Sequence, residues 1–158
     1  MATVTFNIGK GRVIEMYRNL KAGIRPNAAF MVVLLQAVES DATIVDKLTL
    51  DAVLTDVSTT EGNFTNYARQ QIVDGDLSIL PVPDLANDKF DVTFPDVTIV
   101  NAGGALNNNL VKCLLCHVDD TASIVDTDVV PLVAFDFVTT TDGTGLLIQF
   151  PVDAFSAS

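Results

Sequence analysis

The chain has no tryptophan, one histidine and two cysteines among its 158 residues. A single histidine excludes metal centres built on a histidine pair, and two cysteines alone do not complete a four-ligand zinc site. No apolar run approaches the roughly 20 residues that span a bilayer. The first twelve residues also lack the continuous apolar stretch of a secretion signal. We therefore expect synthesis in the cytoplasm and no membrane partner.

Sequence patterns of common enzymes are missing as well. The chain has no Gly-x-Ser-x-Gly elbow, no phosphate-binding glycine loop followed by Lys and Ser or Thr, and no His-Glu-x-x-His. An acidic stretch at 119–128 has the oxygen ligands that calcium prefers, but its spacing fits no EF-hand loop and is typical of a solvated turn. The sequence therefore predicts a non-enzymatic protein without a cofactor.

One string, Cys113-Leu-Leu-Cys116-His117, matches the attachment site of a c-type haem. Its flanking valines and the Gly/Asn-rich turn before it indicate a β-strand. On a strand, side chains three positions apart point to opposite faces. We therefore expect two reduced, buried cysteines that hold neither haem nor metal and form no disulfide with each other.

Basic residues are few and unevenly placed. The chain has nine Lys and Arg against 20 Asp and Glu, a net charge of −11. Five of the nine fall in residues 1–25 beside a single acid, so this segment carries +4 and residues 26–158 carry −15. An acidic body repels phosphate backbones, so nucleic-acid binding is not expected.

Apolar residues recur at helical spacing near the start of the chain. Val13, Tyr17 and Leu20 form a stripe, and Gly23 is a stop signal, which predicts an amphipathic helix over about 10–22. We divide the chain into a basic arm at 1–25 and one β-rich domain at 26–158. The apolar stripe covers either its own domain or a neighbouring subunit. The basic residues either bind an acidic partner or only solvate the outer face of the helix.

The rest of the chain is rich in predicted strands. An apolar run at 28–38 predicts a strand buried on both faces, and a short helix is expected at 44–54. Further strands are expected at 63–73, 89–100, 110–118, 131–140 and 145–152, with Pro95 interrupting the second of these. The predicted fold is mainly β, an antiparallel β-sandwich or barrel with an N-terminal amphipathic helix and one further short helix.

The order of these elements resembles a group of small tailed-bacteriophage virion proteins. The resemblance rests on four segments: "VS…GNFTNYARQ" with Tyr67 and Arg69, "FDVTFPDVTI", the "NAGGALNNN" turn, and "VAFDF" followed by an aspartate-glycine turn and a closing strand. The resemblance covers about residues 29–150. It implies a structural protein of the phage particle, of the head-decoration or minor-capsid type, and the family has no catalytic residues to transfer.

These observations predict a virion protein on the capsid surface that stabilises the head shell. Its partners would be the major capsid protein, copies of itself, or both, giving a homo-oligomer. The predicted contact residues are Lys10, Arg12, Tyr17, Arg18, Leu20 and Lys21. Alternatives are a phage tail or neck component, or a carbohydrate- or ligand-binding module on the particle surface.

Overall fold

A six-stranded antiparallel sheet forms the centre of the computed structural model, which describes residues 3–78, 85–87, 90–151 and 154–157. Its path is β1-β8-β7-β2-β3, with β4 pairing beside β3 on the outer edge of β2. In chain order the strands are β1 (Thr3–Thr5), β2 (Ala29–Ala37), β3 (Thr60–Glu61), β4 (Gln70–Ile72), β7 (Asn109–Val118) and β8 (Val130–Thr140). The three long strands β2, β7 and β8 carry most of the pairing.

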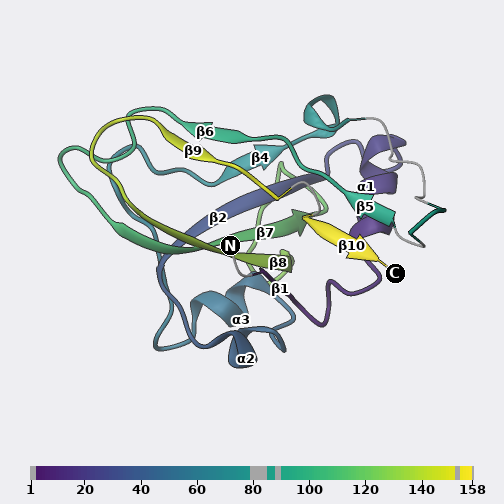
Figure 1. The fold of residues 1–158 in the computed structure, drawn as a ribbon, viewed down its shortest axis with the longest axis horizontal. Helices are drawn as coiled ribbons and strands as arrows, with labels where there is room; N and C mark the ends of the chain where they lie inside the picture. Colours follow the sequence, from purple (N-terminus) through teal and green to yellow (C-terminus); the bar gives the residue numbers. More distant parts are fainter. Residues whose placement is uncertain (1–2, 79–84, 88–89, 152–153, 158) are drawn as a thin grey trace.

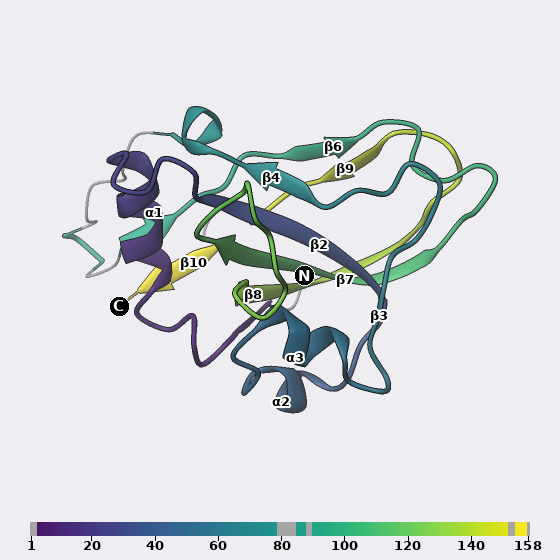
Figure 2. The same cartoon turned by 180° about the vertical axis from the view of Figure 1, so that it is seen from behind.

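Two short antiparallel strand pairs cover one face of this sheet (Figure 1). They are β5 (Phe90–Val92) with β10 (Phe155–Ala157), and β6 (Val97–Ile99) with β9 (Leu146–Ile148). Helix α1 (Val13–Lys21) covers one end of the same face, and a single 3-10 turn, η1, spans Asp74–Asp76. Helices α2 (Asp41–Ile44) and α3 (Leu50–Leu54) cover the opposite face, as Figure 2 shows from behind.

Strand alternation explains why the sheet has a core on each side. In β2, Phe30 and its even-numbered neighbours pack under α1 and the strand pairs, whereas Met31 and its odd-numbered neighbours pack under α2 and α3. Successive side chains of a strand point to opposite faces, so a strand buried on both must be apolar throughout. This confirms the expectation for residues 28–38.

Helix α1 is fixed by its apolar stripe. Val13, Tyr17 and Leu20 recur every three or four residues and are all buried. The Tyr17 ring lies edge-on to Phe94 at a centroid distance of 5.8 Å, and the Tyr17 hydroxyl donates to the backbone oxygen of Ser78 at 3.1 Å. Gly23 follows the helix with φ +67°, a left-handed conformation suited to glycine. The predicted amphipathic helix is present.

The expected boundary at residue 25 has no counterpart in the packing. Strand β1 pairs with β8 from Thr3 to Thr5, and Phe6 is fully buried beneath α2 and α3. Because β1 and α1 each bury apolar side chains against the sheet, the described part of segment 1–25 is integrated in the β-rich body rather than forming an arm beside it. The uneven charge of this segment had suggested the arm.

Other predictions differ from the structure in extent. The mainly β, antiparallel, sandwich-like class is confirmed, and the proline-broken strand is indeed two strands, β5 and β6, on either side of Pro95. The single helix expected at 44–54 is instead α2 and α3, because Thr49 starts a new helix by accepting from the Ala52 amide at 3.2 Å. The strand expected at 63–73 is reduced to the three residues of β4.

Candidate functional site

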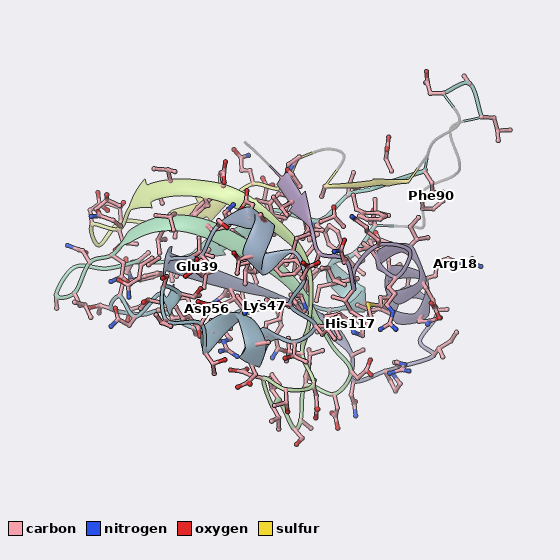
Figure 3. All side chains as sticks on the ribbon, turned by 90° about the horizontal axis from the view of Figure 1, so that it is seen from below. Arg18, Glu39, Lys47, Asp56, Phe90 and His117 are labelled. Carbon is pink, nitrogen blue, oxygen red and sulfur yellow. The ribbon has the colours of Figure 1, made fainter. Side chains whose placement is uncertain are left out.

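Four of the six predicted contact residues lie on the outer side of α1 or in the turn that precedes it. Lys10, Arg12 and Arg18 are exposed, and Lys21 is half-buried, with its ammonium 3.1 Å from an Asp74 carboxylate oxygen. Figure 3 shows Arg18 pointing outward from the helix. In the part of the chain that the structure describes, neither Arg12 nor Arg18 forms an ion pair, so both guanidinium groups are available to a partner.

Tyr17 and Leu20 have a different role from the one predicted. Their exposed fractions are 0% and 2%, because the apolar stripe of α1 covers the protein's own sheet. They cannot touch a partner while α1 stays in place. The prediction that they contact the shell or a neighbouring subunit is therefore corrected: they hold the helix that displays the arginines.

A groove of about 300 Å³ runs beside α1 at the ends of β7 and β8. Its lining comprises Arg12, Glu15, Met16, Asn19, Arg25, His117, Asp119 and Val130, and we call it the helix groove. A second hollow of about 330 Å³ shares Glu15 and Asn19 with it and adds Arg18, Ala22 and the exposed Ile24. The outer face of α1 is thus flanked by two hollows that carry both guanidinium and apolar groups.

The most buried polar group of the helix groove is His117. Its side chain is 4% exposed, and Nδ1 lies 3.5 Å from Oδ1 of Asp119. Asp119 is also ion-paired with the Arg25 guanidinium. Burial lowers the pKa of His117, Asp119 opposes this effect, and Arg25 adds to it. The imidazole is therefore neutral at pH 7 and packs edge-on against Phe30 at 5.6 Å.

The lining of the helix groove favours binding over nucleophilic catalysis. A histidine–aspartate pair orients an imidazole as a base, but this chemistry needs a hydroxyl or thiol within hydrogen-bond reach of the ring. None of the eight lining residues carries one. The groove holds two arginines and two carboxylates beside a neutral imidazole, and Arg25 is already paired with Asp119. Arg12 is therefore the lining cation that remains to bind a carboxylate of a partner.

The cysteines lie away from this groove. Cys113 packs in the core beneath α1 and the strand pairs, and Cys116 packs in the core beneath α2 and α3. Both are free and buried, as the strand argument predicted. Within the described ranges, no three His, Cys, Asp or Glu side chains come together closely enough to hold a metal ion, the acidic stretch at 119–128 included.

Sequence reasoning did not find the cluster of His117, Asp119 and Arg25. The three residues come from the end of β7, the turn after it and the loop after α1. No spacing in the sequence connects Arg25 with Asp119, because their contact depends on how α1 lies across the sheet. The only signal was that this is the one histidine of the chain.

Comparisons with known protein families, curated proteins and solved structures gave no match. Over the described residues, no helix has the length and apolar character needed to cross a membrane.

Proposed function

We propose that this chain is a non-enzymatic structural protein of a tailed-bacteriophage particle, a decoration or minor-capsid subunit that binds the head shell. The resemblance of residues 29–150 to such virion proteins supports this function. A body with a sheet buried on both faces and fixed by two cores is also suited to a subunit that adds contacts between other subunits. Its partners are the major capsid protein, copies of itself, or both.

The observation that carries the proposal is that Arg12, at the start of α1, and Arg18, on its outer face, have no ion-pair partner among the described residues, while the other face of α1 is fixed in the core. Arginine binds carboxylates in a planar, two-point geometry and is enriched at protein interfaces. A rigid helix loses little conformational entropy when it presents such groups. Residues 26–158 carry a net charge of −15, so the rest of the body repels acidic surfaces of a partner.

The first test is the copy number of this chain in purified particles of the phage that encodes it. Quantitative mass spectrometry would compare its abundance with that of the major shell subunit. A near-stoichiometric ratio is expected for a shell-wide decoration protein. A ratio of a few per cent or less assigns the chain to the neck or tail, and absence from the particle rejects the proposal.

A second test concerns the surface. Deletion of residues 1–25 is unsuitable, because it removes β1 and the buried stripe of α1 along with the charges. The double variant Arg12→Gln/Arg18→Gln lowers the charge by two and leaves the core intact. The matched control Leu48→Glu/Val57→Glu makes the same charge change at exposed positions beside α2 and α3.

Binding to shells that lack this chain would be measured by co-sedimentation for both variants. We expect the arginine variant to bind at least about tenfold more weakly, the loss of two charge-assisted hydrogen-bonding groups, while the control binds like the wild type. Equal weakening of both variants would indicate a general charge effect. Undiminished binding of the arginine variant would rule out α1 as the contact surface.

A further inference from the structure

A third hollow is lined by residues in and next to β4 and β6, whose ribbons lie close together in Figure 2, and it shares no residue with the two hollows beside α1. Its volume is about 310 Å³, and its lining comprises Asn66, Gln70, Thr98, Ile99, Val100 and Asn101. We call it the amide hollow. None of its lining residues is charged, although 29 of the 158 residues of the chain are.

The two asparagines of the amide hollow have an unusual backbone. Asn66 has φ +67° and Asn101 has φ +52°, and no other described residue apart from glycine has a positive φ. The side-chain amide nitrogen of Asn66 donates to the Asn101 backbone oxygen at 2.9 Å, so the two turns are linked to each other. Left-handed backbone at a non-glycine residue costs free energy and is concentrated at binding sites.

The loops around the hollow are held in place by further backbone bonds. Thr65 donates to Leu106 at 3.0 Å, and Gly103 donates to Thr65 at 2.9 Å. The Leu106 amide also donates to the Thr65 hydroxyl at 2.9 Å. The turn at 64–67 and the turn at 100–106 therefore form one rigid unit. A rigid lining keeps its polar groups in position before a ligand arrives, which reduces the entropy lost on binding.

Several polar groups of the lining are free to bind a ligand. Gln70 uses its amide nitrogen on the Ala68 backbone oxygen at 2.7 Å, which leaves its carbonyl oxygen as an acceptor. In the described structure, the side chains of Thr98 and Asn101 make no hydrogen bond. Together these side chains offer amide and hydroxyl donors and acceptors. Val100, 70% exposed, adds an apolar surface beside them.

This set of groups selects the class of ligand. A lining without charge does not favour an ion, and a lining of amides and a hydroxyl does not favour a lipid. A peptide strand is also not favoured, because it would bind to the main chain of a sheet edge. Strands β4 and β6 have only three residues each, and the free polar groups of the hollow belong to side chains. Adjacent donors and acceptors beside an apolar patch match the hydroxyl groups and the C–H face of a sugar.

We propose that the amide hollow binds a neutral saccharide, through Asn66, Gln70, Thr98 and Asn101 with Val100 against the sugar ring. This inference goes beyond the proposed function, because it uses neither Arg12 nor Arg18 and does not depend on attachment to a shell. The lining contains no aromatic ring for stacking, so the affinity is weak, with a dissociation constant of about 1 mM. The volume suits one sugar unit.

Binding would be followed by ¹⁵N–¹H NMR of the whole chain, titrated with glucose, galactose, mannose and N-acetylglucosamine up to roughly 50 mM, well above a 1 mM dissociation constant. Glycerol is the control for unspecific hydroxyl contacts, and glucuronate tests the preference for a neutral ligand. We expect saturable shifts of the backbone signals of residues 66–70 and 98–101 with at least one neutral sugar, little with glycerol, and weaker binding of glucuronate.

Neighbouring glutamines on β4 provide the matched variants. Gln70 and Gln71 are consecutive, and only Gln70 lines the hollow, because Gln71 points to the opposite face of the strand. Gln70→Ala is expected to weaken sugar binding about fivefold, the loss of one neutral hydrogen bond, and Gln71→Ala to leave it unchanged. Asn101→Gly removes the amide without backbone strain, since glycine accepts a positive φ, and is expected to weaken binding similarly.

Several results would overturn the inference: no saturable shift with any sugar, shifts as large with glycerol, tighter binding of glucuronate than of glucose, or equal effects of Gln70→Ala and Gln71→Ala. Shell binding by the Arg12→Gln/Arg18→Gln variant is measured separately. A protein that binds shells but no sugar therefore contradicts this inference alone, and one that binds sugar but no shell contradicts the proposed function alone.

Discussion

Cys113 and Cys116 lie on opposite faces of strand β7, Cys113 beneath α1 and the strand pairs and Cys116 beneath α2 and α3. The sheet stands between the two sulfur atoms. The Cys-x-x-Cys-His string is therefore not a haem site in this fold, since a haem needs both thiols on one side. Both cysteines serve as small apolar residues, in the way free cysteine often packs in cores.

The burial of these thiols predicts their reactivity. Desolvation raises the pKa of Cys113 to about 12 and raises that of Cys116 further, so neither is a thiolate at pH 8. We expect no reaction of the native protein with Ellman's reagent over minutes at pH 8, and two reactive thiols per chain in guanidinium chloride. One thiol reacting rapidly in the native protein would contradict the arrangement of β7.

The two faces of α1 predict opposite responses to substitution. Tyr17→Ala removes a fully buried ring and should lower the free energy of unfolding by about 3–5 kcal/mol. Tyr17→Phe removes only the hydrogen bond to Ser78 and should cost about 1 kcal/mol. Arg18→Ala, on the exposed face, should change stability by no more than about 0.5 kcal/mol. Urea denaturation distinguishes these values, and a Tyr17→Ala protein as stable as Arg18→Ala would contradict the packing of α1.

Arg69 joins three parts of the chain. Its guanidinium pairs with Glu61 of β3 at 2.8 Å and with Asp126 in the loop before β8, and Tyr67 donates to the same Glu61 carboxylate at 2.7 Å. The hydrogen bonds that Arg69 donates to Glu61, and then those it donates to Asp126, raise the pKa of its guanidinium. Tyr67 and Arg69 both bind Glu61 and so help to hold the segment at 61–72 in place.

Arg69→Ala leaves Glu61 and Asp126 without their shared partner. We expect a loss of about 2 kcal/mol, less than the 3–5 kcal/mol of a fully buried pair, because the three side chains remain 24%, 23% and 32% exposed. Arg25→Ala is the matched control, since the Arg25–Asp119 pair is at least half exposed and should contribute no more than about 0.5 kcal/mol. Equal losses of unfolding free energy for the two variants in chemical denaturation would show that Arg69 does not stabilise the loop that holds Asp126.

Long, strongly patterned segments were predictable from the sequence, and short or context-dependent ones were not. Strands β2, β7 and β8 have nine to eleven residues with clear apolar patterns, and all three were expected close to their observed bounds. Strands β1 and β10 have three residues each, too few for a period-two pattern to stand out, so neither was expected. Their positions are set by pairing with β8 and β5.

The same limit applies to the sites. Helical spacing predicts that Tyr17 and Leu20 are buried on one stripe, but it does not tell whether the covering surface belongs to the same chain or to a partner. The helix groove and the amide hollow each join residues from distant segments. Asn66 and Asn101, for example, are ordinary turn formers in sequence, and only the fold places their left-handed backbones side by side.

The last prediction concerns pH. Burial lowers the pKa of His117 in the folded protein, whereas the unfolded chain protonates its histidine near the ordinary value of about 6.5. The unfolded state therefore binds more protons around this pH, so the free energy of unfolding should fall as the pH drops from about 7 to 5.5. His117→Phe, which keeps a ring against Phe30, should lose this part of the pH dependence.

NMR titration of the one histidine of the chain checks the cause directly. Its midpoint should lie below 6.5. Asp119→Asn should lower the midpoint further, because Asp119 favours the charged ring, and Arg25→Gln should raise it, because Arg25 disfavours that form. Opposite shifts from two residues that pair with each other identify electrostatics in the helix groove as the cause. A midpoint at or above 6.5 in the wild type would contradict the burial of the imidazole, and shifts of the same sign in both variants would contradict its placement beside Asp119 and Arg25.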